Sequence, residues 1–305
     1  MTNTSTARPQ GRSIYRSESG RLAVTGWCRE QLTTWPLPHE RHRLTALGAD
    51  THVVEAGPGD RQSGGAGTVV YVPGTNVSVA AQFPLVSALA ARGRVVAVDV
   101  PGQPGLSDGA RIPSSGRLAW YGRWLAEVID AVADHGPVTV LGHSLGSAIT
   151  MACPSPRVRH QVLVSPAGLV SLRVTPSVAL VSTAWVLRRR EADSERLLRL
   201  MHAHGHPPRA ELVEWMTLVG RHVRSSADPG RAPVGRPDVS RTVLSGGADV
   251  FLPPARVAPA VSRALGSPLR VLDGAGHFVV DERPEELAAL ATAPRPGSGG
   301  VVAAS

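Results

Sequence analysis

Residues 138–146, VTVLGHSLG, are the stretch that decides the fold of this chain. The first four residues are aliphatic or β-branched and predict a buried strand, and those after Gly146 can form a helix. Between the two lies a G-x-S-x-G pentapeptide centred on Ser144. A serine on so sharp a turn sits in strained backbone, and side chains two residues before and after it would collide. We expect the Ser144 hydroxyl to be presented at the carboxyl end of a strand, as a nucleophile would be.

Further short apolar runs lie on both sides of this strand in the sequence. They recur with turn signals and helix-like stretches between them, which predicts parallel strands joined by helical crossovers, buried on both faces. With the strand at 138–141 between them, these runs lie at residues 68–72, 94–99, 161–164, 242–244 and 269–272. Two earlier runs, residues 42–47 and 51–55, flank a Gly-Ala-Asp turn and predict an edge hairpin. The expected fold class is therefore α/β.

Two downstream segments supply the partners that a nucleophilic serine needs. A hydroxyl is a weak nucleophile at neutral pH, so it requires a base and a carboxylate that orients the base. Asp249 follows the strand at 242–244, and His277 follows the strand at 269–272. Because the carboxyl ends of parallel strands meet at one crevice, Ser144, Asp249 and His277 are predicted to converge there.

Each of the three residues also has an ordinary interpretation. Ser144 is then a turn serine, Asp249 caps the segment that follows it, and His277 is a loop histidine satisfied by its neighbours. The position of all three just beyond predicted strands favours the catalytic interpretation over these alternatives.

Together the three motifs resemble the α/β-hydrolase fold superfamily. The resemblance extends over roughly residues 40 to 292. It assigns the nucleophile elbow to Ser144, the acid loop G-x-x-D-x-x-x-P to residues 246–253 and the G-x-G-H motif to residues 274–277. Residues 99–108, DVPGQPGLSD, are similar to a loop that follows the fourth strand of the family. The resemblance implies a mostly parallel eight-stranded sheet flanked by helices, an inserted helical cap and a carboxylesterase-like serine hydrolase.

The loop after the third strand departs from the family pattern. It usually begins His-Gly, whereas residues 72–76 read VPGTN. The resemblance assigns the oxyanion hole to the backbone N–H groups of Thr75 and Leu145, and a backbone donor does not depend on the missing histidine. Pro73 therefore alters the support of the loop without removing the donors. Asn76 is a candidate side-chain donor to substrate, the alternative being that it satisfies its own turn.

The strand pattern stops between residues 169 and 238, where helix-like segments at 178–190, 194–204 and 209–223 take over. Their apolar positions recur at helical spacing, which predicts a helical cap inserted over the catalytic face. The α/β-hydrolase core is then expected at residues 13–168 and 239–292. Disordered ends are expected at residues 1–12 and 293–305.

Specificity is expected to depend on the cap. Most of its apolar residues should pack the insertion onto the sheet, and some should line a pocket for a mainly apolar acyl or alcohol group. The candidate substrate-binding residues are Asn76, His143, Trp185, Trp215 and Phe278.

The composition fits a globular enzyme better than a nucleic-acid-binding or membrane protein. The 305 residues carry a net charge of +8, but all 32 basic residues are arginines scattered beside acidic residues, and only 4% of residues are aromatic. This pattern is typical of a solvated surface and provides no stacking platform for bases. The sequence contains no apolar run that predicts a membrane span or a signal peptide, so a cytoplasmic location without a membrane partner is expected.

Neither a metal nor a cofactor is expected. The cysteines Cys28 and Cys153 are too few for a disulfide framework or a cysteine metal site. The alternation of His202, His204 and His206 has no carboxylate or cysteine at ligand spacing. Chemistry of the Ser-His-Asp type needs no cofactor.

The sequence thus predicts a serine hydrolase that cleaves an ester or related acyl bond of a small molecule through an acyl-enzyme intermediate. Thioester hydrolysis and carbon–carbon bond hydrolysis use the same triad and are alternatives. A rival from a different class is a catalytically silent binding protein with this fold, which Pro73 supports. The sequence makes no prediction of the oligomeric state.

Overall fold

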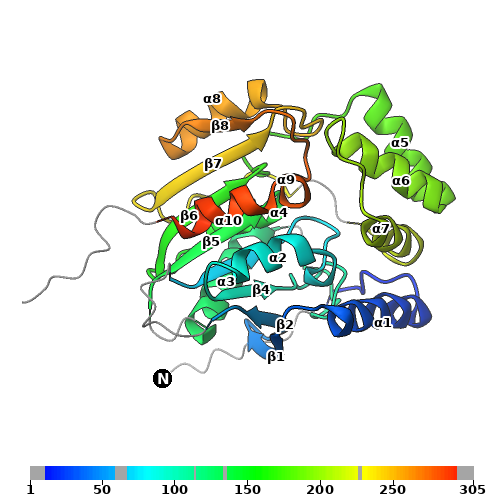
Figure 1. Cartoon of the computed structure of the whole chain (residues 1–305), viewed down its shortest axis with the longest axis horizontal. Helices are drawn as coiled ribbons and strands as arrows, with labels where there is room; N and C mark the ends of the chain where they lie inside the picture. Colours follow the sequence, from blue (N-terminus) through cyan, green and yellow to red (C-terminus); the bar gives the residue numbers. More distant parts are fainter. Residues whose placement is uncertain (1–10, 59–66, 113–114, 133–135, 226–228, 294–305) are drawn as a thin grey trace, which may run out of the picture.

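The chain is organised around an eight-stranded sheet, which confirms the predicted α/β architecture (Figure 1). The computed structural model describes residues 11–58, 67–112, 115–132, 136–225 and 229–293. The strand order is β1-β2-β4-β3-β5-β6-β7-β8, with β1 antiparallel to β2, β2 antiparallel to β4, and the other neighbours parallel. The strands are β1 (His39–Ala46), β2 (Ala49–Ala56), β3 (Val69–Val72), β4 (Val95–Val98), β5 (Val138–His143), β6 (Val158–Val164), β7 (Ser240–Gly246) and β8 (Leu269–Leu272).

Each apolar run that the sequence marks as a strand forms one, and the predicted edge hairpin is β1 with β2. All residues of β3 and β4 are buried, because these strands lie inside the sheet with helices on both faces. At the other edge β8 is more open, and Val271 remains 41% exposed. β5 lies near the middle of the sheet, so its carboxyl end is enclosed by neighbouring strands.

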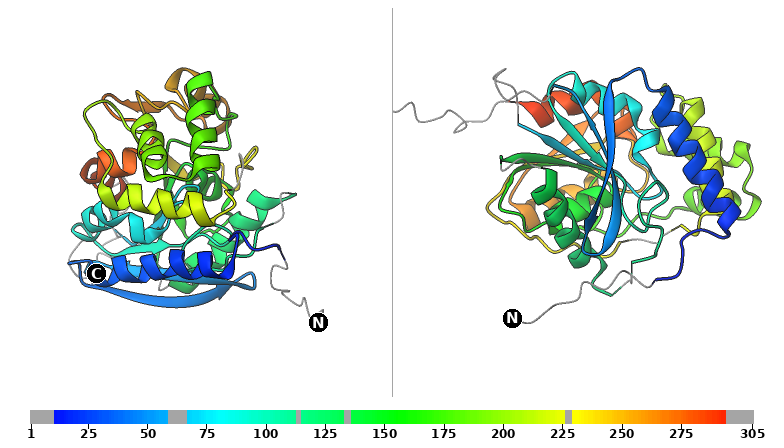
Figure 2. Two further views of the ribbon diagram at one scale, coloured as in Figure 1. Left: turned by 90° about the vertical axis from the view of Figure 1, so that its right-hand side faces the viewer. Right: turned by 90° about the horizontal axis from the view of Figure 1, so that it is seen from below.

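Helices cover both faces of the sheet, as seen from two further directions in Figure 2. Residues of α3, α4 and α8 share one buried apolar cluster with one face, and residues of α2, α9 and α10 share another with the opposite face. The helices are α2 (Phe83–Ala90), α3 (Arg117–Val132), α4 (Leu145–Ala152), α8 (Pro254–Leu265), α9 (Val279–Glu282) and α10 (Pro284–Thr292), together with the short 3-10 helix η2 (Val79–Ala81).

Three helices occupy the segment where the strand pattern stops. They are α5 (Pro176–Arg188), α6 (Glu191–Met201) and α7 (Ala210–His222), and they lie beside the sheet at the right of Figure 1. Arg189 adopts a left-handed conformation with φ 55°, which ends α5 and lets the chain turn into α6.

A fourth helix, α1 (Glu18–Thr34), lies alongside α7 although it is distant in sequence (Figures 1 and 2). The rings of Trp27 and Trp215 pack against each other at this contact, with centroids 5.0 Å apart and planes tilted by 36°. Sequence reasoning placed this stretch in the core without identifying the helix. The signal was present, since Val24, Cys28 and Leu32 recur at helical spacing, and Ser17 caps the helix by accepting the Gly20 N–H.

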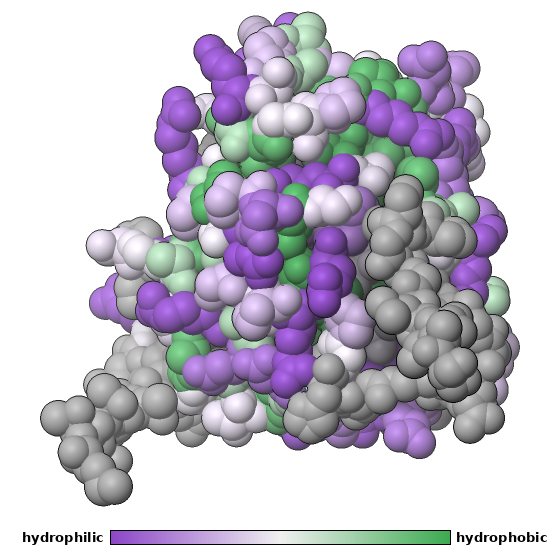
Figure 3. All heavy atoms as spheres, turned by 90° about the vertical axis from the view of Figure 1, so that its left-hand side faces the viewer, coloured by the Kyte–Doolittle hydropathy of each residue, from purple (hydrophilic) through white to green (hydrophobic). Residues whose placement is uncertain are grey.

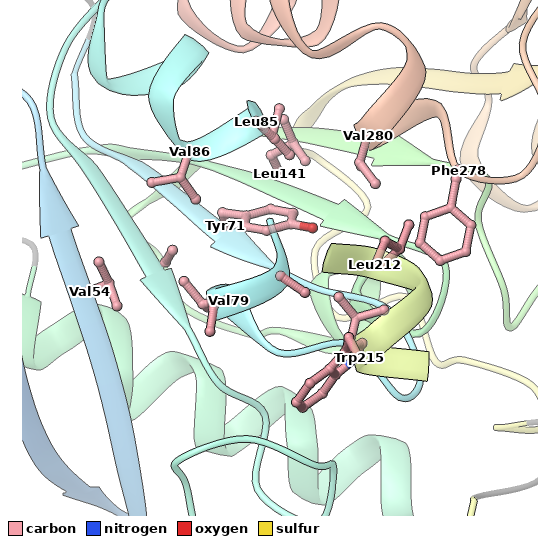
Figure 4. Packing of buried hydrophobic residues seen from close by; sticks show 14 of the residues in the cluster. Val54, Tyr71, Val79, Leu85, Val86, Leu141, Leu212, Trp215, Phe278 and Val280 are labelled. Carbon is pink, nitrogen blue, oxygen red and sulfur yellow. The ribbon is translucent and has the colours of Figure 1, made fainter. Parts of the chain in front are cut away.

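One buried apolar cluster connects the sheet with α7 (Figure 4). Tyr71 of β3 lies in its centre and is fully buried, with its hydroxyl donating to Gln82 Oε1 at 2.7 Å. Phe278 and Leu212 face each other from the loop after β8 and from α7. The helices beside the sheet are therefore fixed by a continuous core.

The face opposite α5, α6 and α7 shows hydrophilic side chains with apolar ones scattered among them (Figure 3). Such scattered apolar residues are normal for a folded domain. The predicted disordered ends fall largely outside the described residues. At the amino-terminal boundary, Arg12 is described, and its carbonyl accepts the Arg111 N–H at 3.0 Å.

Candidate active site

Ser144 stands on a sharp turn between β5 and α4. Its backbone has φ 52° and ψ −111°, a conformation that L residues rarely adopt. A Cβ on Gly146 would overlap the Val72 carbonyl oxygen, and a Cβ on Gly142 would overlap the Gly146 carbonyl oxygen. The two glycines are therefore required by the close approach of three backbone segments. The turn leaves the Ser144 hydroxyl without a hydrogen bond to the helix that it begins.

His277 and Asp249 form a buried pair, with His277 Nδ1 2.8 Å from Asp249 Oδ2. The carboxylate can only accept, so Nδ1 carries the proton and Nε2 keeps its lone pair. Asp249 Oδ1 accepts the backbone N–H groups of Phe251 and Leu252 at 3.0 and 2.8 Å. One carboxylate oxygen is thus held by the backbone and the other by the imidazole.

These contacts keep Asp249 ionised. Burial by itself would raise the pKa of this carboxyl, but the neighbouring His277 and the hydrogen bond from Leu252 outweigh it and lower the pKa to about 2. The imidazole is therefore held by a charged acceptor across the physiological pH range.

His143 fixes the backbone of His277 by a hydrogen bond. Its Nε2 donates to the His277 carbonyl oxygen at 2.9 Å, and the two rings lie 5.2 Å apart. Burial disfavours the charged imidazole, and together with the neighbouring His277 it lowers the pKa of His143 to about 3. His143 is therefore a neutral donor at pH 7.

The buried neutral His143 predicts acid destabilisation of the fold. Its pKa falls from 6.5 to about 3, so between these values the unfolded chain binds a proton that the folded chain does not. Stability should then be lost as the pH falls below 6.5, by at most about 1.4 kcal/mol per pH unit from this group. Urea unfolding of the native chain and of His143→Gln between pH 7 and pH 4 measures this contribution. The slope should be shallower in the variant, and parallel curves would contradict the prediction.

The His277 loop is bound to the end of α6. The N–H of His277 donates to the Met201 carbonyl oxygen at 2.7 Å. Glu282, which is buried, accepts the N–H of Gly276 at 2.7 Å and the N–H of Ala203 at 2.6 Å. Sequence reasoning did not identify Glu282, because its partners are backbone groups of two segments that meet only in the folded chain.

The candidate oxyanion donors lie on either side of Ser144. Leu145 is the first residue of α4, where the helix leaves its N–H without an intrahelical partner. Thr75 lies in the loop after β3 and lines the same cavity as Ser144. Within the described residues, neither N–H donates to another protein group. Gly74 allows the loop to approach His143, whose Nδ1 would lie 3.0 Å from a Cβ at this position.

Asn76 does not satisfy its own turn. It has φ 62°, its N–H donates to Gln103 Oε1 at 3.0 Å, and its Nδ2 donates to Ser225 Oγ at 2.7 Å. Its carbonyl oxygen accepts from Trp215 Nε1 at 2.8 Å. Its buried Oδ1 has no hydrogen-bond partner among the described residues. The side chain therefore fixes the loop and keeps one buried acceptor unused.

Asp99 organises the backbone beyond this loop. Its buried carboxylate accepts from His52 Nδ1 at 3.1 Å, from Ser78 Oγ at 2.9 Å and from the Val79 N–H at 2.8 Å. Burial alone would raise the pKa of Asp99, but the neighbouring His52 and the backbone hydrogen bonds from Leu106 and Val79 outweigh it and lower the pKa. The segment that resembles the family's loop after the fourth strand thus anchors η2.

A cavity of about 290 Å³ lies over Ser144, between the sheet and the helices beside it. Ser144 and His277 both line it, and so do Asn76, His143, Trp185 and Phe278 from the sequence-predicted set. From the apolar cap positions that recur at helical spacing in the sequence, Leu197, Met201 and Met216 line the cavity. Lining residues that the sequence did not indicate include Leu172, Ser182, Val186 and Phe251.

Trp215 is the predicted substrate-binding residue that does not line the cavity. It is fully buried between Trp27 and the Asn76 carbonyl, and it supports the loop from behind. Periodicity places Trp215 on the inner face of α7, but the contact with α1 decides that this ring fills the core.

The three histidines of the His-x-His-x-His stretch do not share a site. His202 Nδ1 donates to the Leu198 carbonyl oxygen at 2.8 Å, and His206 Nε2 lies 3.0 Å from Arg283. In the described ranges, no group of three or more His, Cys, Asp or Glu side chains is arranged to hold a metal ion. None of the helices in these ranges combines the length and apolar character needed to cross a bilayer.

The central parallel sheet, the elbow at Ser144 and the His277–Asp249 pair after later strands define an α/β-hydrolase architecture. Residues 69–290 match the alpha/beta hydrolase family. The chain therefore belongs to this family. No curated protein sequence matches it significantly.

Solved structures share the fold at low sequence identity. Carboxylesterase CesB from Bacillus subtilis has a TM-score of 0.69 and 20% identity, covering 89% of this chain and 96% of that one. Naproxen esterase (carboxylesterase NP) from Bacillus subtilis has a TM-score of 0.71 and 20% identity, covering 90% and 98%. A putative aryl esterase from Burkholderia cenocepacia has a TM-score of 0.64 and 19% identity, covering 82% and 95%.

Proposed function

We propose that this protein hydrolyses esters of small molecules through a Ser144-His277-Asp249 triad. The observation that carries the proposal is that Ser144, on its strained turn, and His277, held by Asp249, line one cavity. The esterase names of three proteins with the same fold are consistent with this chemistry.

In the proposed reaction the Nε2 of His277 takes the Ser144 proton as Oγ attacks the ester carbonyl carbon. The alcohol leaves with the proton returned by His277, and the acyl group stays on Ser144. Water, deprotonated by His277, then attacks the acyl-enzyme and releases the acid. Asp249 stays ionised throughout and stabilises the imidazolium, since its pKa lies near 2.

The oxyanion of each tetrahedral intermediate would be stabilised by the N–H groups of Thr75 and Leu145. Both are backbone donors with no competing acceptor among the described residues, so they are preorganised for a developing charge. Pro73 removes neither donor. The loop is instead fixed through Asn76, which replaces support from a histidine by bonds to Gln103 and Ser225.

The cavity favours an apolar acyl or alcohol group. Its walls from α5, α6 and α7 are largely aliphatic or thioether side chains, among them Val186, Leu197 and Met216. Burying such a group contributes about 25 cal/mol per Å² of apolar surface, whereas a charged group would lose its hydration without a partner. We infer that α1 with α5, α6 and α7 forms one cap, because α1 packs on α7 and the Trp27 ring contacts the Trp215 ring.

Fluorophosphonate labelling of the folded chain and turnover of p-nitrophenyl esters of increasing acyl length test the proposed function. We expect labelling at Ser144, and hydrolysis that is faster for medium apolar acyl chains than for charged short ones. A folded sample that neither reacts with the probe nor hydrolyses any ester would favour the silent binding protein. Preference for charged short substrates would contradict the apolar assignment alone.

A further inference from the structure

A second cavity, of about 640 Å³, lies beside the chain segment that precedes α5. Its walls are α8, residues 168–171 and residues 231–232. Neither Ser144 nor His277 lines it. Its volume is within the range of small-molecule binding pockets.

Three arginines line this cavity, which we call the arginine groove, and the lining contains no acidic residue within the described ranges. Arg231, Arg256 and Arg263 are exposed, and none forms an ion pair with a described residue. Many other arginines of this chain are paired, as Arg94 is with Glu55 and Arg209 with Asp281. The groove therefore gathers positive charge that the fold leaves uncompensated, and such a concavity concentrates anions.

The arginines are placed around a hollow of small side chains. Arg256 and Arg263 are seven residues apart on α8, so they project from the same side of the helix about 10 Å apart along its axis. Ala260 and Ala264 lie between and beside them and leave the space open. Arg231 stands on the other wall, next to Ala232, whose N–H donates to the Gly168 carbonyl oxygen at 2.9 Å.

We propose that the arginine groove binds a small organic molecule that carries phosphate groups. Guanidinium groups match phosphate oxygens with paired N–H donors and are always charged, which a multiply charged phosphate ester needs. The alanine floor suits the organic part of such a ligand. The groove is large, and Arg256 and Arg263 are separated along α8. A ligand with two phosphoryl groups therefore fits better than a single monovalent anion, because each phosphoryl group can contact a different arginine.

The groove borders the proposed active site without being part of it. Residues 168–171 line the groove, whereas the flanking Ala167 and Leu172 line the Ser144 cavity. Gly168 has φ 91°, and a Cβ there would lie 2.8 Å from the Ala232 Cβ and 3.1 Å from the Ala148 Cβ. The shared segment is thus held tightly between the elbow helix and the groove wall. Phosphate binding is a property separate from ester hydrolysis.

Isothermal titration of the full chain with inorganic pyrophosphate at low ionic strength tests this site. We expect saturable binding that weakens with added salt. The dissociation constant should rise by about tenfold or more for each arginine removed, measured with Arg256→Gln, Arg263→Gln and the double variant. Arg92→Gln, which removes an exposed arginine from the opposite face of the sheet, is the matched control and should bind as the native chain does.

Two further titrations separate the possible outcomes. Ser144→Ala should bind pyrophosphate unchanged, so a failure of ester hydrolysis and a failure of the groove are distinguishable. Citrate should bind more weakly than pyrophosphate, and equal binding would overturn the assignment to phosphate. Absence of binding at millimolar pyrophosphate, or binding that the α8 variants leave unchanged, would overturn the site itself.

Discussion

Replacing Ser144 by alanine should lower kcat for ester hydrolysis by at least about 10⁴-fold and abolish fluorophosphonate labelling. The reason is that His277 then has no hydroxyl at position 144 to activate, while the cavity and the proposed oxyanion donors remain. The fold should survive, because the hydroxyl makes no hydrogen bond to α4 and the strained backbone is held by Gly142 and Gly146. Steady-state kinetics and urea unfolding of the same preparations measure both effects.

The matched control is Ser262→Ala, which removes an exposed hydroxyl from α8 and should leave turnover and labelling unchanged. Retention of labelling and turnover in Ser144→Ala would show that a different residue is the nucleophile. A loss of activity together with a loss of the unfolding transition would instead indicate a role of Ser144 in folding.

Replacing Asp249 by asparagine should lower kcat by about 10⁴-fold while leaving the native shape intact. Two backbone N–H groups, of Phe251 and Leu252, bond Oδ1, so the amide oxygen of the asparagine must take that place. The amide NH₂ then faces His277 Nδ1, which must become the acceptor. The proton moves to Nε2, and His277 can no longer take the proton of Ser144.

NMR of the histidine ring nitrogens reports this change directly, with Nδ1 protonated in the native chain and Nε2 in Asp249→Asn. Asp273→Asn is the control, since Asp273 is an exposed carboxylate in the loop before His277. Unchanged kcat in Asp249→Asn, with the Nε2–H tautomer established, would exclude His277 as the general base.

The link between α6 and His277 bears on the proposed specificity. Met201 lines the cavity over Ser144 and accepts the His277 N–H with its carbonyl oxygen. Glu282 joins the same two segments through the N–H groups of Gly276 and Ala203. A substrate that displaces the end of α6 therefore also displaces the general base of the proposed reaction, and small errors in such positioning are costly.

Local patterns in the sequence were sufficient for the sheet and for the chemistry-bearing residues. A strand buried on both faces has a near-continuous apolar run, and β3, β4 and β5 all have one. The sequence pattern shows glycine at 142 and 146 because backbone crowding leaves no room for a Cβ at either position. Asp249 and His277 could be found because each directly follows a strand.

Packing between distant segments could not be predicted from the sequence in the same way. The α1 stretch has helical spacing, but nothing local indicates that it packs on α7 and turns Trp215 away from the cavity. Asn76 was expected at the site, yet its partners Gln103 and Ser225 come from distant loops.

The sequence by itself determined the strands, the elbow at Ser144 and the order of the proposed nucleophile, acid and base, because each depends on residues that are neighbours in the chain. Only the tertiary structure decided which apolar residues of α5, α6 and α7 line the cavity over Ser144, how Glu282 joins the histidine loop to the end of α6, and that Arg231 shares a groove with Arg256 and Arg263. The physical reason is that burial and charge at these positions are set by segments far apart in sequence, whose approach is fixed by the packed core.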